Sequence, residues 1–104
     1  MRIYISGPIT GNPDFRDEFE DAAAILEERG YEYINPAKLA EVIPGAEWRK
    51  YLAIDFQIIQ MADAITFLPG ADQSKGSQKE RLWAKGFGLQ IYDIETDTFR
   101  SCDE

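Results

Sequence analysis

Apolar residues recur along the chain at two alternating spacings, and these predict strands that alternate with helices. Short apolar runs that are typical of buried strands occupy residues 2–6, 31–35, 64–69 and 89–94. Between the first two runs, apolar residues follow at helical spacing: Phe15, Phe19, Ala22, Ala23 and Leu26. Because strands and helices alternate, we expect a parallel sheet with right-handed crossovers and helices on both faces.

Three helices are predicted in all. The first is expected to have Asn12 as its N-cap and Pro13 in its first turn. A stronger helix runs from about residue 47 to 62, and a short one spans about 78–87. The segment from 36 to 47 is ambiguous, with room for one helical turn.

Length and composition favour a single domain over residues 1–94. The chain has 104 residues, 44% of them hydrophobic, which is enough for one packed core and too few residues for two domains. The fold class that we expect is α/β, a three-layer, doubly wound parallel sheet of the flavodoxin or Rossmann type with about four to five strands. Residues 95–104 are expected to form an acidic C-terminal tail, either poorly ordered or in contact with another subunit.

Charge and residue types exclude several classes of function. The net charge is −8, with 11 basic against 19 acidic residues, which argues against polymeric nucleic acid and anionic membranes as partners. The chain has no histidine and one cysteine, Cys102, which excludes a zinc site, a Ser-His-Asp triad and an internal disulfide. We therefore expect no metal and no cofactor, and acid–base chemistry that uses Asp, Glu, Tyr or Lys.

The hydropathy pattern also bears on localisation. No apolar run approaches the about 20 residues that are needed to cross a bilayer. The first residues are typical of a strand and not of a secretory signal. A cytoplasmic protein is therefore expected.

Two glycine-rich loops mark the expected ligand site. Open parallel sheets bind ligands outside the carboxyl ends of their strands, and here that rule indicates the loops at residues 6–12 and 69–77. Neither loop has a Walker A or G-x-G-x-x-G pattern. Each is either a tight turn or a site at which serine hydroxyls and backbone amides receive sugar hydroxyls or a phosphate.

Asp55 interrupts an apolar stripe on the second predicted helix. The stripe consists of Trp48, Tyr51, Leu52, Ile58, Ile59 and Ala62. A carboxylate on a core-facing stripe is costly unless it is paired or faces a cavity. Asp55 therefore either lies at the edge of the stripe or lines a pocket with a raised pKa and gives a proton to a leaving group.

Glu80 also allows two interpretations. Ser77 and Glu80 have the spacing of a capping box, in which each side chain bonds the other residue's backbone amide. Alternatively, Glu80 is an ionised carboxylate in a pocket, able to attack the anomeric carbon of a sugar. Tyr4, on the first strand, is either a core tyrosine or a hydroxyl that reaches this pocket.

Taken together, these features resemble the nucleoside 2-deoxyribosyltransferase-like superfamily, which includes 2'-deoxynucleoside 5'-monophosphate N-glycosidases. More closely, the chain resembles a branch of small proteins that are common in phages and bacteria. The matching segments are "YISGPITG" at 4–11, "NP" at 35–36, "WRKYLAID" at 48–55, "ADAITFLPG" at 62–70 and "SKGSQKERLWAKGFG" at 74–88.

The resemblance implies roles for individual residues. It makes Glu80 the nucleophile, Asp55 the group that contacts or protonates the nucleobase, and Tyr4 a hydroxyl near the nucleophile. Ser74 stands where the monophosphate hydrolases have serine and the transferases aspartate, which favours a nucleotide as substrate. Asp63 is expected to bond loop N–H groups at the turn before its strand. The substrate-binding residues that we expect are Ser6, Gly7, Pro8, Ile9, Asp63, Ser74, Gly76 and Ser77.

Three functions follow as hypotheses. The first is N-glycosidic bond cleavage or deoxyribosyl transfer on a (deoxy)nucleoside or its 5'-monophosphate. The second is a non-catalytic protein that senses or sequesters a nucleotide, and the third is a structural or partner-binding protein. By analogy with the family, and because apolar side chains such as Trp48 and Tyr51 suggest a shared surface, we expect a homodimer or larger homo-oligomer.

Overall fold

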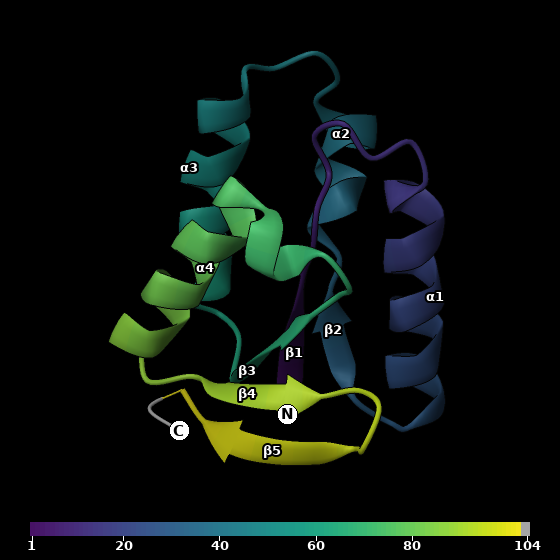
Figure 1. Cartoon of the computed structure of the whole chain (residues 1–104), viewed down its shortest axis with the longest axis vertical. Helices are drawn as coiled ribbons and strands as arrows, with labels where there is room; N and C mark the ends of the chain where they lie inside the picture. The colour runs from purple at the N-terminus through teal and green to yellow at the C-terminus, as the bar shows by residue number, and fades with distance from the viewer. Residues whose placement is uncertain (103–104) are drawn as a thin grey trace.

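The computed structural model describes residues 1–102 and confirms the three-layer α/β fold (Figure 1). The sheet order is β2-β1-β3-β4-β5, in which the first four strands are parallel and β5 is antiparallel to β4. The strands are β1 (Arg2–Ser6), β2 (Glu32–Ile34), β3 (Ala64–Phe67), β4 (Gln90–Asp93) and β5 (Thr98–Ser101). The helices are α1 (Phe15–Glu28), α2 (Leu39–Val42), α3 (Trp48–Ile59) and α4 (Lys75–Gly86), with 3-10 turns η1 (Pro36–Lys38) and η2 (Ala71–Gln73).

Helices cover both faces of the sheet. Figure 1 shows α1 on one side and α3 and α4 together on the other. The α1 face buries Phe19 and Leu26 against Ile3 and Ile5 of β1, and the opposite face buries side chains of α3 and α4 against alternate residues of the same strands. This alternation follows from the two-residue period of a strand, because successive side chains point to opposite faces.

The start of α1 differs from the prediction. The proposed N-cap at Asn12 is wrong, since α1 begins at Phe15 after Asp14. The Asn12 side-chain oxygen accepts from the Asp14 amide at 3.2 Å, while its amide group donates to the Pro8 carbonyl and the Glu18 carboxylate at 3.0 and 2.7 Å. Because of this local turn, α1 begins later than predicted. The same side chain links the loop after β1 to the first turn of α1.

Residues 98–101, within the segment that was assigned to an acidic tail, form the edge strand β5. Phe99 lies opposite Tyr92 of β4, and both rings pack with Tyr31. Arg29 donates to the Tyr92 hydroxyl and to the Ile94 carbonyl at 2.6 and 2.7 Å, which links the end of α1 to this hairpin. Residues 103–104 of the predicted tail lie outside the described part.

None of the helices within residues 1–102 is both long enough and apolar enough to cross a lipid bilayer.

Candidate active site

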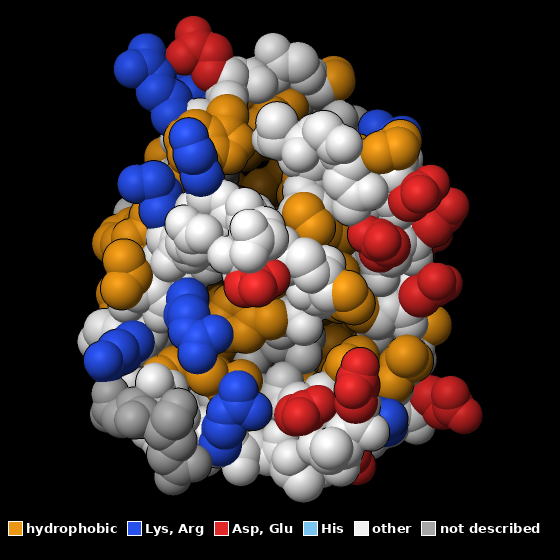
Figure 2. All heavy atoms as spheres, viewed as in Figure 1, with side chains coloured by type: hydrophobic (Ala, Val, Ile, Leu, Met, Phe, Trp, Pro, Cys, Tyr) orange, Lys and Arg blue, Asp and Glu red, His pale blue; other side chains and the backbone are white. Residues whose placement is uncertain are grey.

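A cavity of about 670 Å³ opens at the carboxyl ends of β1 and β3, between α3 and the start of α4. The sheet order reverses at this pair of strands, which is where open α/β sheets bind ligands. Its walls include side chains of η1, α2 and α3, and Figure 2 shows the hollow with hydrophobic side chains at its bottom. The volume is in the range of small-molecule sites.

Two glycines allow the loops after β1 and β3 to meet beside this cavity. A Cβ atom on Gly7 would lie 2.9 Å from the Cβ of Leu68, too close to be tolerated without movement. Gly70 has a φ of +87°, in the left-handed region, and lies against Pro8. The glycines predicted from the loop sequences therefore bring the two loops together.

Glu80 lies at the floor of the cavity and is held by β1. Its side chain is 5% exposed, and it accepts hydrogen bonds from Tyr4 Oη at 2.5 Å and from Ser6 Oγ at 2.7 Å. The Oγ atoms of Ser6 and Ser77 form a further bond of 2.9 Å. Because a hydroxyl has one proton, Ser77 donates in that bond when Ser6 donates to Glu80. Tyr4 and Ser6 are fully buried and do not line the cavity, so they position Glu80 from behind.

The capping box predicted for Ser77 and Glu80 is wrong. The N-cap of α4 is Ser74, whose Oγ accepts from the Ser77 amide at 3.3 Å. The helix thus begins three residues earlier than the capping box requires, and Glu80 lies in its second turn. The Glu80 carboxylate accepts hydrogen bonds from Tyr4 and Ser6 of β1 and does not cap the helix.

Asp55 lines the same cavity as Glu80 and belongs to the buried stripe of α3, with Leu52 and Ile59. It is 8% exposed, and its Oδ1 atom has no hydrogen-bond partner among the described residues. A buried, unpartnered carboxyl oxygen costs free energy unless the group is protonated or a ligand supplies the partner. Of the two interpretations of Asp55, the structure supports the one in which it faces a pocket.

The two carboxyl groups titrate as a pair. Burial, followed by the charge of Glu80, raises the pKa of Asp55 from 3.8 to about 8. Burial also raises the pKa of Glu80, but the hydrogen bonds from Tyr4 and Ser6 oppose that rise. The pKa of Tyr4 is raised well above 10.0 by burial and by the charge of Glu80, so its hydroxyl remains a donor. At neutral pH Asp55 is therefore the group of the pair that keeps its proton, while the hydrogen bonds from Tyr4 and Ser6 favour the ionised form of Glu80.

The cavity also contains residues that the sequence analysis did not assign to the site. Of the predicted binding residues, Gly7, Pro8, Ile9, Ser74, Gly76 and Ser77 line it. The cavity is also lined by Trp48, Tyr51 and Leu52. These three residues belong to the same apolar stripe as Asp55, so the stripe could have predicted them as part of the site. Lys75 supplies a cation at the mouth, next to Ser74, and its place in the loop at residues 69–77 was the signal that could have identified it.

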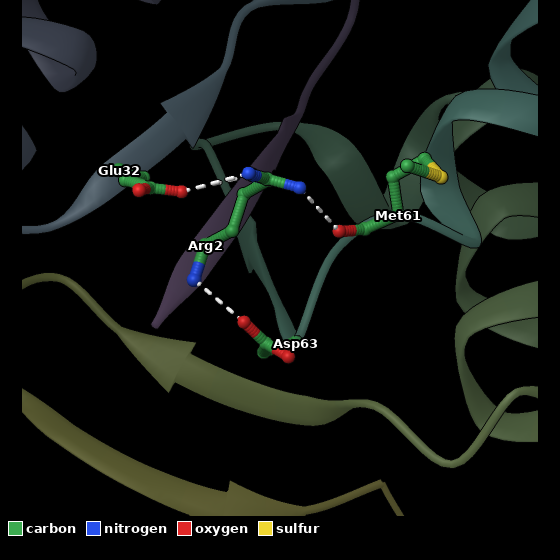
Figure 3. Close-up of polar contacts among 4 residues, drawn as sticks. All are labelled: Arg2, Glu32, Met61 and Asp63. Atoms are coloured by element: carbon green, nitrogen blue, oxygen red, sulfur yellow. Dashed lines mark hydrogen bonds and ion pairs between the residues drawn. The ribbon is translucent and has the colours of Figure 1, made fainter.

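Two of the predicted binding residues, Ser6 and Asp63, do not line the cavity. Ser6 is fully buried behind Glu80, and Asp63 lies elsewhere. It precedes β3, at the end of the sheet opposite the cavity (Figure 3). One of its carboxylate oxygens accepts from the Arg2 backbone amide at 2.9 Å. The Arg2 side chain forms an ion pair with Glu32 at 2.9 Å and donates to the Met61 carbonyl. Asp63 therefore joins β1 to the turn before β3 and does not contribute to the site.

A family model matches residues 1–93, and the family is described as a domain of unknown function, DUF4406. A comparison with curated protein sequences finds no match.

Two solved structures share the fold. One is the CMP N-glycosidase of Clostridium botulinum, with a TM-score of 0.62 and 22% identity over 89% of this chain and 67% of that one. The other is a 2-deoxyribosyltransferase from Bacillus psychrosaccharolyticus, with a TM-score of 0.69 and 18% identity over 89% of this chain and 71% of that one. The resemblance to the nucleoside 2-deoxyribosyltransferase-like superfamily is confirmed at the level of the fold.

Proposed function

The chain belongs to the DUF4406 family, and we propose that it cleaves or transfers the N-glycosidic bond of a (deoxy)nucleoside or its 5'-monophosphate. The observation that supports this most is the pair of buried carboxyl groups, Glu80 and Asp55, which line one cavity and of which Asp55 has its pKa raised to about 8. Two structures with the same fold are an N-glycosidase and a deoxyribosyltransferase.

The chemistry assigns one role to each group. A carboxylate oxygen of Glu80 forms a bond to C1' of the sugar, while the bond from C1' to the base nitrogen breaks and its electron pair leaves with the base. Asp55 transfers its proton to the departing base, which neutralises the developing charge. Water or a second base then attacks C1' and releases Glu80, and the Asp55 carboxylate takes back a proton.

The remaining residues position and enclose the substrate. Tyr4 and Ser6 keep the Glu80 carboxylate oriented and ionised. Ser74 and Gly76 line the cavity at the start of α4, which supports a role for them, with the loop after β1, in binding a sugar hydroxyl or a phosphate. Trp48 offers an apolar face to the base.

Base release from a panel of nucleosides and 5'-monophosphates tests this proposal. Wild-type protein should release a free base, and Glu80→Gln should reduce the rate by about a thousand-fold or more. Glu27→Gln, which changes an exposed glutamate on α1, is the matched control and should keep the wild-type rate. Thermal stabilisation by a nucleotide without base release would instead support the sensing or sequestering protein.

The expected homodimer stays a prediction. Trp48 is 45% exposed and Leu82 on α4 is 70% exposed, which leaves apolar surface for a second subunit. Light scattering tests it, and a monomer at micromolar concentration would contradict it.

A further inference from the structure

A second cavity, of about 700 Å³, lies between the carboxyl ends of β3 and β4. The two strands pair only at Ala64–Gln90 and Ile65–Ile91. Each stays paired with its other neighbour to its last residue. Beyond Ile65 and Ile91 the strands therefore diverge, as Figure 1 shows, and side chains from both of them line the opening.

Two arginines on this cavity have no anionic partner. Arg81 comes from α4 and Arg100 from β5. Within residues 1–102 neither guanidinium group forms an ion pair or a hydrogen bond, and that of Arg81 lies 5.2 Å from the centre of the Phe67 ring. Figure 2 shows basic side chains over α4 and the strands below it, next to acidic ones. In a chain of net charge −8, two guanidinium groups left unpaired at one cavity indicate a site for an anion.

An unsatisfied polar group lies beneath the lining of the cavity. Thr66 of β3 is 1% exposed, and its hydroxyl has no hydrogen-bond partner among the described residues. Buried hydroxyls without a partner are uncommon, and each calls for a missing partner. The Thr66 hydroxyl oxygen is closed off from the cavity, so a ligand supplies this partner only when neighbouring side chains move.

The rim of the cavity also carries carboxylates. Asp72, Asp93 and Glu95 line it together with the two arginines. Asp93 Oδ1 accepts from the backbone amides of Glu95 and Thr96 at 2.9 and 3.4 Å, which fixes that carboxylate at the rim. Carboxylates only accept hydrogen bonds when ionised, so this rim suits a group rich in hydroxyl donors.

We propose that the cavity binds a small phosphate ester with free hydroxyl groups, that is, a sugar phosphate. Its phosphate contacts Arg81 and Arg100, and its hydroxyls contact Asp93 and Glu95. The site is separate from the first cavity, because neither Glu80 nor Asp55 lines it. Ser77 lines both cavities and belongs to the hydrogen-bonded group that holds Glu80, so the ligand would contact the base of the first site.

Backbone-amide NMR with ribose 5-phosphate as the probe tests the proposal. The titration is made in a Glu80→Gln background, so that its outcome does not depend on turnover. Saturable shifts are expected at the amides of Thr66, Tyr92 and Arg100. Arg100→Gln and Arg81→Gln should each weaken binding at least about tenfold, whereas Lys79→Gln, an exposed charge loss on the same helix outside both cavities, should change Kd less than about twofold.

Ribose and inorganic phosphate serve as the two partial probes. Each should bind more weakly than ribose 5-phosphate, because each makes only one set of contacts. The proposal is overturned if ribose 5-phosphate gives no saturable shift at the second cavity or shifts only amides of the first cavity, such as Gly7. Equal weakening by Lys79→Gln and the arginine variants would also overturn it, since binding would then depend on overall charge alone.

Discussion

The carboxylates at the two ends of the sheet differ in burial and in their partners. At the amino end, Asp63 and Glu32 are exposed and each bonds Arg2, one through the backbone amide and the other through the guanidinium (Figure 3). At the carboxyl end, Asp55 and Glu80 are buried beside each other, and no ion pair neutralises either within the described residues. The first arrangement fastens strands together. The second costs stability, and it is the arrangement that the proposed chemistry requires.

After Glu80→Gln, the largest expected effect comes from removing the proton donor at the carboxyl end. Asp55→Asn keeps the shape of the side chain but cannot give a proton to the leaving base. The rate of base release should fall by about 10²–10⁴-fold, with a smaller loss for substrates whose base leaves without protonation. Steady-state kinetics on two bases of different leaving ability measure this. An equal loss on both bases would contradict the role of Asp55 as a proton donor.

Stability should depend on pH because of the same residue. Folding raises the pKa of Asp55 from 3.8 to about 8, so between these values the native state retains a proton that the unfolded chain has lost. The free energy of unfolding should therefore decrease as the pH rises from about 4 to 8, by on the order of a few kcal/mol. Urea unfolding across this range measures it. In Asp55→Asn the decrease should be clearly smaller, and an identical pH profile would contradict the burial of an ionisable Asp55.

Tyr4→Phe should have a moderate effect on rate. The variant loses the donor that lowers the pKa of Glu80, so the carboxylate becomes protonated at higher pH. The acidic limb of the pH–rate profile should shift upward, and the rate at neutral pH should fall by about tenfold. Loss of the buried hydrogen bond should also cost about 1–2 kcal/mol of stability. A drop in rate with no shift of the acidic limb would indicate a packing role alone.

The smallest effect is expected at the amino end. Asp63→Asn weakens an exposed contact to the Arg2 amide and should cost about 1 kcal/mol or less. The rate of base release should not change. A tenfold loss of rate in this variant would indicate that Asp63 contributes to substrate binding. The functional difference between the two ends of the sheet would then not hold.

The sequence predicted most of the fold because its signals are local. Residues 2–6 and 64–69 are short apolar runs, and the stripe that contains Asp55 has clear helical spacing. Each signal arises from a period of two or 3.6 residues that burial on one face imposes. The same stripe alone identifies Asp55 as a carboxylate among apolar positions.

Features that depend on distant contacts were harder to predict. Ser74 and Ser77 are both plausible helix caps, and what separates them is the bonding of Glu80 to Tyr4 and Ser6, more than 70 residues away. Strand β5 is short and largely polar, and its pairing with β4 defines it. The second cavity arises because β3 and β4 diverge after two paired positions. No local pattern in the sequence predicts this divergence.

The most direct test of the central claim is the search for a covalent glycosyl group on Glu80. Wild-type protein is mixed with a substrate that shows base release, quenched in acid within the first turnover, and analysed by intact and peptide mass spectrometry. The account predicts a mass increase equal to one glycosyl unit, located on the peptide that contains Glu80 and absent from Glu80→Gln. Base release at the wild-type rate by Glu80→Gln, or an adduct on another residue, would contradict it.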